Sequence, residues 1–582
     1  MQLAPSLNAR RWVATLEEFV RNELLLVGIL IALGTVVPVI LGAASGALDI
    51  PRNDDWSYRR TALDLWQTGR LEFDGVAAPI LIGQVLLVQP FLWLTHGSST
   101  GFAFAGAIVS LAATLGVYAM ARNLLTPARS FLVTLSLLLF PGYLAYGTSF
   151  MTDGPALAAQ AGAIAIGMSA FVVSPTNLRR LALAMAIAVI GFSIRQFALA
   201  AVVALALAAI AREPRRMGTW GVALAGIASC ALIDVARSAI PLPPVVLTPD
   251  IWFATRIPQA AVTISLMALP AAVIGIITNR REFRRRDASF GAILGVGLAI
   301  PIAAHWIRFR DFPEALLGNL ATQQGVLNAL DVRADRPYLF TDSFWSAVNV
   351  LGVIALVVVG AAISAGVGAR RRRAGGSARN LREVGTPVGL VTTFVVVTTV
   401  GLAAYGSLWI VFDRYLWPLV PALAALLAMP LSGTSSTEPT QEFGWGRVLR
   451  PPTVVPLAIL TLQGILALTL MVNAMAFDVA RWRSGEALTA AGLAEDTIDA
   501  GYEWVGAHAT TPADLWHAVP ENPSNRWWAL SLTCGVVTGS GEPPSQARLV
   551  GVESYRLYLF AGPIVVLYLY RSDDPSCAGV SG

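Results

Sequence analysis

The sequence Pro51-Arg52-Asn53-Asp54-Asp55-Trp56-Ser57-Tyr58 directly follows the first long apolar run of the chain, at residues 24–44. It places two adjacent carboxylates and two aromatic rings just outside a predicted membrane span. Ionisable groups beside a bilayer are costly, and by default they mark substrate sites. We therefore expect the fold and the function to be organised around this loop.

The composition is that of an integral membrane protein. Of 582 residues, 55% are hydrophobic and only 13% are charged, and the mean hydropathy is +0.63. Many apolar runs reach the roughly 20 residues that cross a bilayer. The formal net charge of +5 does not indicate a nucleic-acid partner, because the basic residues form short clusters between apolar runs, as topology signals do.

The apolar runs predict an all-α polytopic protein with about 13 transmembrane helices. These helices are expected at residues 24–44, 102–121, 131–148, 154–173, 181–194, 197–211, 217–236, 259–278, 289–306, 343–366, 386–404, 413–430 and 453–475. With residues 1–23 cytoplasmic, the clusters Arg280–Arg286 and Arg370–Arg373 fall on the inner side, in keeping with the positive-inside rule. This predicts a multi-pass protein of the plasma (inner) membrane with an extracytoplasmic C-terminus.

The first outer loop is expected at residues 45–100, within a transmembrane domain of residues 24–475. Ala77–Leu94 is apolar, but it contains Gln84, Gln89 and Pro90. An interfacial helix lying on the membrane fits these residues better than a further span.

The composition becomes mixed polar at residues 476–582, which predicts a small extracytoplasmic α/β domain. A helix is expected at Glu486–Ala500, and strands at Arg556–Phe560 and Ile564–Tyr570, from their β-branched and aromatic residues. Cys534 and Cys577 both lie in this domain. A disulfide, which an oxidising compartment permits, and two free thiols are equally open.

The Asp54-Asp55 pair has two interpretations. A carboxylate held near a reacting hydroxyl and partly removed from water is a suitable general base. The alternative is a solvated acidic loop or the N-cap of a helix that starts near Trp56.

The pattern Asp54-Asp55-x-x-Tyr58 after a first transmembrane helix resembles the GT-C superfamily of polyprenyl-phosphate-sugar-dependent glycosyltransferases. The similarity is greatest to the branch of protein O-mannosyltransferases and lipid A aminoarabinose transferases, which typically has Asp-Glu-x-x-Tyr in this loop. The resemblance implies that Asp54 is the catalytic base and that Asp55, which stands where Glu is usual, orients the acceptor or supports the base. Tyr58 and Trp56 are expected to contact substrate, although an aromatic belt at the interface also explains such residues.

Two further stretches resemble the same family. Ser149-Phe150-Met151-Thr152-Asp153-Gly154-Pro155 opens the fourth predicted span, where such enzymes often carry an Asp near the donor, and Asp153 takes that place. A helix cap with Pro155 in the first turn is the alternative. Ile194-Arg195-Gln196-Phe197 separates two short apolar runs, so that Arg195 is expected to contact phosphate or substrate, or else to pair with an acid.

The last such stretch is Phe412-Asp413-Arg414-Tyr415-Leu416-Trp417-Pro418, at the start of the twelfth predicted span. An Arg presents a planar fork of donors that binds a phosphate bidentately. Arg414, followed by Tyr415, is therefore expected to bind the lipid phosphate. The alternative is an interfacial belt of Arg, Tyr and Trp.

The resemblance implies inverting transfer of a hexosyl or pentosyl group from a polyprenyl-phosphate sugar to a hydroxyl of a glycan, lipid or protein at the outer face. The three Cys and four His have no metal-ligand spacing, so no metal site is predicted. No cofactor is expected to be required, although adjacent Asp residues bind divalent ions weakly. The alternatives are a transporter or lipid flippase, which would place charges along a pathway, and a non-catalytic envelope scaffold.

Overall fold

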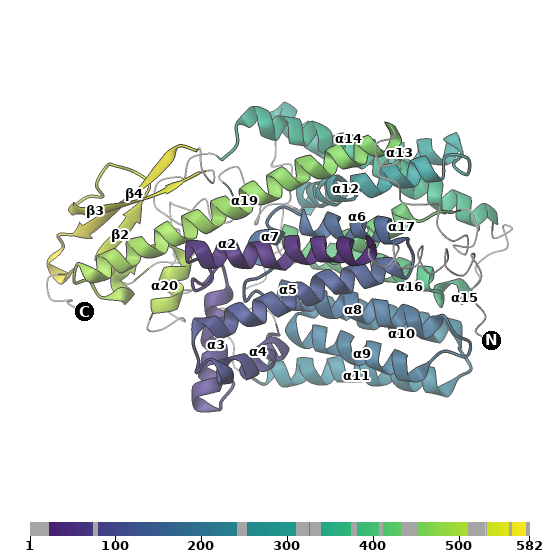
Figure 1. Ribbon diagram of the computed structural model, residues 1–582, viewed down its shortest axis with the longest axis horizontal. Coiled ribbons are helices and arrows are strands. Elements are labelled where there is room, and N and C mark those ends of the chain that lie inside the picture. The colour runs from purple at the N-terminus through teal and green to yellow at the C-terminus, as the bar shows by residue number, and fades with distance from the viewer. Residues whose placement is uncertain are drawn as a thin grey trace, which may run out of the picture.

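The computed structural model describes most of the chain. The described residues are 22–73, 80–240, 253–309, 325, 339–373, 381–406, 411–431, 451–509, 530, 532–557 and 562–577. Figure 1 shows a bundle of roughly parallel helices with a small sheet beyond one end and helix α3 lying across that same end.

Within the described residues, nine helices are long and apolar enough to cross a membrane. They are the first helix (Asn22–Ser45, which includes η1, Ala32–Val36, and ends as α2, Val37–Ser45), α5 (Ser99–Arg122), α8 (Asp153–Phe171), α11 (Met217–Ser238), α12 (Phe253–Thr278), α13 (Arg285–Phe309), α14 (Asp342–Arg373), α16 (Pro387–Gly406) and α19 (Pro451–Ala490). Large apolar side chains such as Leu232, Ile293 and Leu462 are exposed on them, as lipid-facing residues are. The predicted multi-pass membrane fold is confirmed.

Four shorter helices occupy the remaining predicted spans. They are α6 (Pro127–Leu138), α9 (Leu178–Ile194), α10 (Leu199–Arg212) and α17 (Leu419–Ala428). They have 12, 17, 14 and 10 residues, below the roughly 20 that cross a bilayer unaided. The count of 13 crossings therefore stays a prediction.

The span predicted at residues 131–148 is wrong as a single helix. Helix α6 ends at Leu138, and the short helix α7 (Tyr143–Tyr146) begins after a turn. Pro141 has no N–H for a helical hydrogen bond, and Gly142 has a φ of 84°, in the left-handed region. This pair of residues ends the helix and directs the chain to the end of the bundle where α3 lies.

Two helices occupy the loop predicted to be the first outer one. Helix α3 (Asp55–Thr68) ends at Gly69, whose φ of 71° is the usual left-handed helix stop. Helix α4 (Ile82–Leu94) has 13 residues, or about 20 Å, which is too short to cross a bilayer. Its Gln84 donates a hydrogen bond to the carbonyl of Phe150, so the polar side chain that counted against a span faces protein. Residues 77–79 of the predicted interfacial helix lie outside the described residues.

Helix α19 connects the bundle to the C-terminal sheet (Figure 1). Its 40 residues span about 60 Å, twice the roughly 30 Å of a bilayer core. The expected domain boundary at residue 476 therefore falls inside one continuous helix. The separate helix predicted at Glu486–Ala500 is wrong, because α19 ends at Ala490 and Gly492 turns the chain with a φ of 86°.

The C-terminal domain is α/β, as predicted. Its sheet has the order β1-β2-β4-β3, with β1 parallel to β2 and the other pairs antiparallel. Its elements are η4 (Glu495–Thr497), β1 (Ile498–Asp499), α20 (Tyr502–His508), β2 (Gly535–Thr538), β3 (Ala547–Arg556), β4 (Ile564–Ser572) and η5 (Pro575–Cys577). The strand predicted at Ile564–Tyr570 is confirmed as β4. Of the strand predicted at Arg556–Phe560, only Arg556 lies in a strand, as the last residue of β3. Residues 558–560 of that prediction lie outside the described residues.

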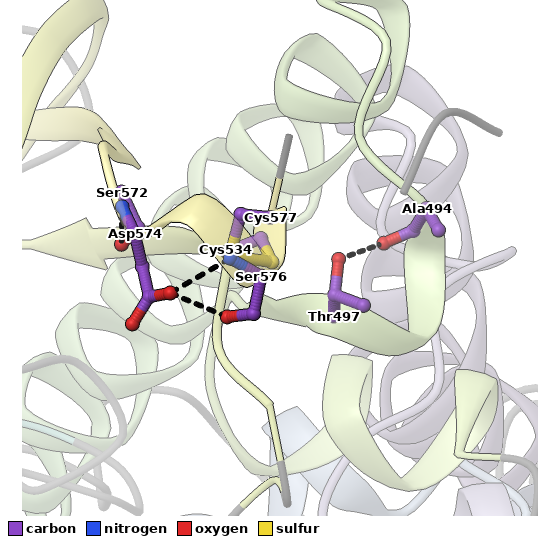
Figure 2. The surroundings of a disulfide bond; sticks show 7 residues. All are labelled: Ala494, Thr497, Cys534, Ser572, Asp574, Ser576 and Cys577. Carbon is purple, nitrogen blue, oxygen red and sulfur yellow. Dashed lines mark hydrogen bonds between the residues drawn. A yellow bond between two sulfur atoms is a disulfide. The ribbon is translucent and has the colours of Figure 1, made fainter. Parts of the chain in front are cut away.

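A disulfide bond joins Cys534, just before β2, to Cys577 in η5. Figure 2 shows this bond beside the turn in which Asp574 accepts hydrogen bonds from the backbone N–H and the hydroxyl of Ser576. Of the two alternatives left open by the sequence, the bonded pair is present. Cys230 in α11 is a buried free thiol.

The loops predicted to be cytoplasmic are joined to one another. Arg129 in α6 donates to the carbonyl of Ala428 at 3.0 Å, and Asn279 after α12 donates to that of Met429 at 3.0 Å. Arg372 at the end of α14 pairs with Asp287 in α13. These contacts gather the inner loops at one end of the bundle, opposite to α3.

Candidate active site

Four stretches that are far apart in the sequence meet at the α3 end of the bundle. Asp54 directly precedes α3, and Asp153 is the first residue of α8. Arg195 lies at the break between α9 and η2 (Gln196–Ala198), and Arg414 lies in η3 (Asp413–Leu416). These are four of the five charged residues to which the sequence motifs assigned a role, and we call them the charge cluster; the fifth is Asp55.

Arg414 bridges the two acids of the charge cluster. Its Nη2 is 3.1 Å from Oδ2 of Asp54, and its Nε is 3.6 Å from Oδ2 of Asp153. Arg195 closes the cluster, with its Nε 3.3 Å from Oδ1 of Asp153, and also donates to the hydroxyl of Thr152. Two acids and two arginines are formally neutral together, which limits the cost of burying four charges.

Asp54 is the most accessible member of the cluster. Its side chain is 24% exposed, against 4% for Asp153, 7% for Arg195 and 5% for Arg414. Asp54 stands at the N-cap position of α3, but its side chain makes no capping hydrogen bond. The cap that the sequence left open is therefore not what holds this carboxylate, which is partly exposed.

Asp55 has a different environment from Asp54. It is fully buried, and its Oδ1 accepts from the backbone N–H of Arg52 at 2.7 Å. Its Oδ2 accepts from Arg59 and from the backbone N–H of Phe150, both at 3.3 Å. The carboxylate of Asp55 thus ties the loop to α3 and to the segment before α8.

The adjacent carboxylates do not converge on a common point that would suit a divalent ion. Asp54 faces Arg414, and Asp55 faces Arg59. In the part of the chain that the structure describes, no group of three or more His, Cys, Asp or Glu residues is placed to hold a metal.

Two tyrosines surround the charge cluster. The ring centroid of Tyr415 lies 4.7 Å from Cζ of Arg195, so the guanidinium stacks on the ring. Tyr58, in the first turn of α3, is buried. Burial first, and then the charge of Asp54, raises the pKa of Tyr58 well above its usual value. Both residues lie beside the cluster, and their contact with substrate stays a prediction.

Trp56 is packed inside the protein. Its ring is 2% exposed and meets the ring of Tyr502 edge-on at 5.8 Å. It also lies against Gly506, where any Cβ would meet the indole. The structure thus places Trp56 as an anchor for α20, and the exposed ring face that sugar stacking requires is covered.

Tyr502 is a site residue that the sequence motifs did not indicate. Its hydroxyl donates to Oδ1 of Asp54 at 3.0 Å, although 448 positions separate the two residues. Tyr502 opens α20, and its neighbours in the sequence match no motif. The break in composition near residue 476 marks its domain, but only the docking of α20 shows the contact.

A second group of charges joins the Asp54 loop to α19 and α20. Glu503 accepts a hydrogen bond from the backbone N–H of Asn53 at 2.8 Å and forms an ion pair with Arg481 of α19 at 2.7 Å. Arg52 pairs with Asp478 of α19 at 3.4 Å. Asn53 has a φ of 53°, a left-handed conformation that Asn tolerates better than most residues. The loop is therefore held on both sides of Asp54.

Comparison with known proteins finds a family match over part of the chain. Residues 83–236 match the model of the family "Dolichyl-phosphate-mannose-protein mannosyltransferase". The matched segment contains Asp153 and Arg195, whereas Asp54 and Arg414 lie outside it. Over residues 83–236, this match confirms the predicted resemblance to membrane glycosyltransferases.

Solved structures with similarity to the chain include two proteins. Oligosaccharyltransferase AglB from Archaeoglobus fulgidus, in complex with an inhibitory peptide and a dolichol-phosphate, shares 14% identity at a TM-score of 0.42, over 87% of this chain and 69% of that one. ArnT from Cupriavidus metallidurans, bound to undecaprenyl phosphate, shares 13% identity at a TM-score of 0.37, over 87% and 75%. No curated protein matches the chain in sequence.

Proposed function

We propose that the chain is an inverting glycosyltransferase that moves a sugar from a polyprenyl-phosphate donor to an acceptor hydroxyl at the extracytoplasmic face of the membrane. The observation that carries the proposal is the position of Asp54. Its carboxylate is the accessible one in the charge cluster, and it touches the arginine that is best placed to receive a phosphate.

The chemistry follows from these positions. Asp54 takes the proton of the acceptor hydroxyl, whose oxygen attacks the anomeric carbon. The bond from that carbon to the phosphate oxygen breaks, and its electron pair stays on the phosphate. Arg414 and Arg195 are the cations that stabilise this developing charge.

The ion pair between Asp54 and Arg414 is the resting arrangement in this mechanism. In an in-line displacement, the attacking oxygen and the leaving phosphate lie on opposite faces of the anomeric carbon. A sugar between them must part the Asp54 carboxylate from the Arg414 guanidinium, which are 3.1 Å apart at Nη2. Arg414 then exchanges one anion for another, the carboxylate for the donor phosphate.

The disulfide supports an extracytoplasmic site. A bond between Cys534 and Cys577 persists in an oxidising compartment and is rare in the cytosol. The same domain supplies Tyr502 to Asp54. The site therefore faces the compartment in which the disulfide forms. In this proposal the protein lies in the plasma (inner) membrane, with its C-terminus outside the cell and its N-terminus in the cytoplasm.

We further propose that no metal takes part. Both acids of the charge cluster are neutralised by arginine, and a carboxylate with such a partner is a poor ligand for a divalent ion. Transfer that is unchanged by EDTA is the expected result. Loss of transfer with EDTA and its recovery with added Mg²⁺ or Mn²⁺ would contradict this part of the proposal.

Transfer from a labelled panel of hexosyl and pentosyl polyprenyl phosphates, measured in membranes, tests the function. We expect Asp54→Asn to remain folded and to lose transfer by about 10²- to 10⁴-fold, the typical effect of removing a general base. Asp64→Asn, the same change elsewhere on α3, is the matched control and should transfer like wild type. Full activity of Asp54→Asn would end the assignment of the base.

The alternative function, a transporter or lipid flippase, would place charges along a path through the middle of the membrane. The four charges of the cluster instead gather at one end of the bundle. If folded wild-type protein transfers no sugar from any donor, the enzyme proposal fails, and lipid translocation becomes the activity to measure.

A further inference from the structure

We infer that the C-terminal domain completes the active site through Tyr502, a positioning residue that holds the carboxylate of Asp54 in the orientation for proton transfer. The inference rests on the proposed function, because it assigns to Tyr502 a part in the reaction that Asp54 is proposed to catalyse.

The first step is the geometry at Asp54. Its Oδ2 accepts from Arg414 at 3.1 Å, and its Oδ1 accepts from the hydroxyl of Tyr502 at 3.0 Å. The torsion that orients a carboxylate is broad and roughly two-fold, so a single contact leaves the group free to turn. Two donors from different elements, η3 and α20, fix that torsion and decide which lone pairs face an incoming hydroxyl.

The second step is the protonation of Tyr502. Burial, followed by the charge of Asp54, raises the pKa of the Tyr502 hydroxyl well above its usual value. The hydroxyl therefore keeps its proton at any working pH and acts towards Asp54 as a donor. A hydrogen bond from a hydroxyl to a carboxylate is charge-assisted and stronger than a neutral one.

The third step is the way in which α20 is held. Asn53 and Asp54 contact Glu503 and Tyr502 in turn, so that two consecutive loop residues bind two consecutive residues of α20. Arg481, which is fully buried in α19, pairs with Glu503 at 2.7 Å. The hydroxyl of Tyr502 is thus aligned by α20, which an ion pair holds to the long helix α19.

The fourth step concerns the donor-bound state. When the donor phosphate takes Arg414 away from Asp54, the contact with Tyr502 is the one that still orients the carboxylate. Its loss should therefore slow the chemical step more than it weakens donor binding. Loss of this contact should therefore lower kcat and leave KM for the donor unchanged.

The test is Tyr502→Phe, which removes one oxygen and retains the ring that packs against Trp56. We expect kcat to fall about 10- to 100-fold, as for a lost hydrogen bond to a charged group, with KM for the donor within about twofold.

Tyr570→Phe is the matched control, because it removes another tyrosine hydroxyl hydrogen bond of the same domain, to the carbonyl of Gly541. It should leave kcat and KM for the donor as in wild type. Wild-type kinetics in Tyr502→Phe, beside an inactive Asp54→Asn, would overturn the inference and leave the proposed function standing.

A measurement that needs no activity separates the two proposals further. The tyrosine bands in resonance Raman spectra report whether a hydroxyl donates or accepts, and the Tyr502 contribution is the difference between wild type and Tyr502→Phe. That contribution should change in Asp54→Ala, which removes the acceptor. If it does not change, the contact is absent and the inference fails, whether or not any donor is a substrate.

Discussion

Arg414 and Asp54 are separated by 360 positions in the sequence, yet the guanidinium Nη2 of one lies 3.1 Å from the carboxylate Oδ2 of the other. This pair joins the two motifs on which the proposed chemistry depends. Because Arg414 also contacts Asp153, one side chain relates the loop before α3 to the start of α8.

Replacing Arg414 by Lys should reduce kcat/KM by about 100-fold or more, even though the charge is retained. A lysine ammonium lacks the planar fork that reaches both Asp54 and Asp153 and later holds a phosphate bidentately. Initial rates with the preferred donor provide the measurement. Arg371→Lys, at an exposed arginine near the C-terminal end of α14, is the control. An Arg414→Lys variant as active as wild type would contradict the bidentate role.

Asp55→Ala should lower the stability of the fold and not only the rate of transfer. The fully buried carboxylate pairs with Arg59, and removing one partner of a buried pair typically costs about 3–5 kcal/mol. Thermal unfolding in detergent should therefore show a lower midpoint for Asp55→Ala than for wild type, whereas Asp54→Asn should unfold like wild type. Equal midpoints for Asp55→Ala and wild type would show that Asp55 does not hold the loop.

Gly506→Ala should impair transfer without touching the charge cluster. A Cβ at Gly506 would meet the Trp56 indole, so α20 and its Tyr502 must shift away from Asp54. Transfer rates in membranes measure the effect. Gly221→Ala is the control, because a Cβ at Gly221 in α11 meets no atom within 4 Å. A second change, Trp56→Phe, frees space and should restore part of the activity, a result that simple misfolding would not produce.

The disulfide should be reducible from outside the cell, and its two cysteines should then be open to labelling from the same side. In intact cells, an impermeant maleimide should label Cys534 and Cys577 only after a reductant is added. Loss of the bond should destabilise the domain by about 2–4 kcal/mol, a typical value for such a cross-link. The buried Cys230 is the control and should stay unlabelled in both cases. Labelling that requires permeabilised membranes would place the C-terminal domain, and the site with it, on the cytoplasmic side.

The extent of prediction from sequence can be followed at particular residues. The long apolar helices could be located because hydropathy is a local property, and the stretches around Asp54, Asp153, Arg195 and Arg414 could be found because each is a local motif. The break at Pro141-Gly142 was missed, although both residues are known helix stops, because the apolar character continues across it.

By itself, the sequence determined that this is a polytopic membrane protein with an α/β segment at its C-terminus, and it selected the four residues of the charge cluster. Burial and side-chain direction required the tertiary structure. Asp54 and Asp55 are identical and adjacent, and only the folded surroundings direct one to Arg414 and the other into the protein. Tyr502 lies in no motif, and it reaches Asp54 because α19 runs unbroken from the membrane into the C-terminal domain and carries the partners of α20. Such long-range contacts depend on how the helices pack, and the residues next to Tyr502 and Asp54 in the sequence do not reveal them.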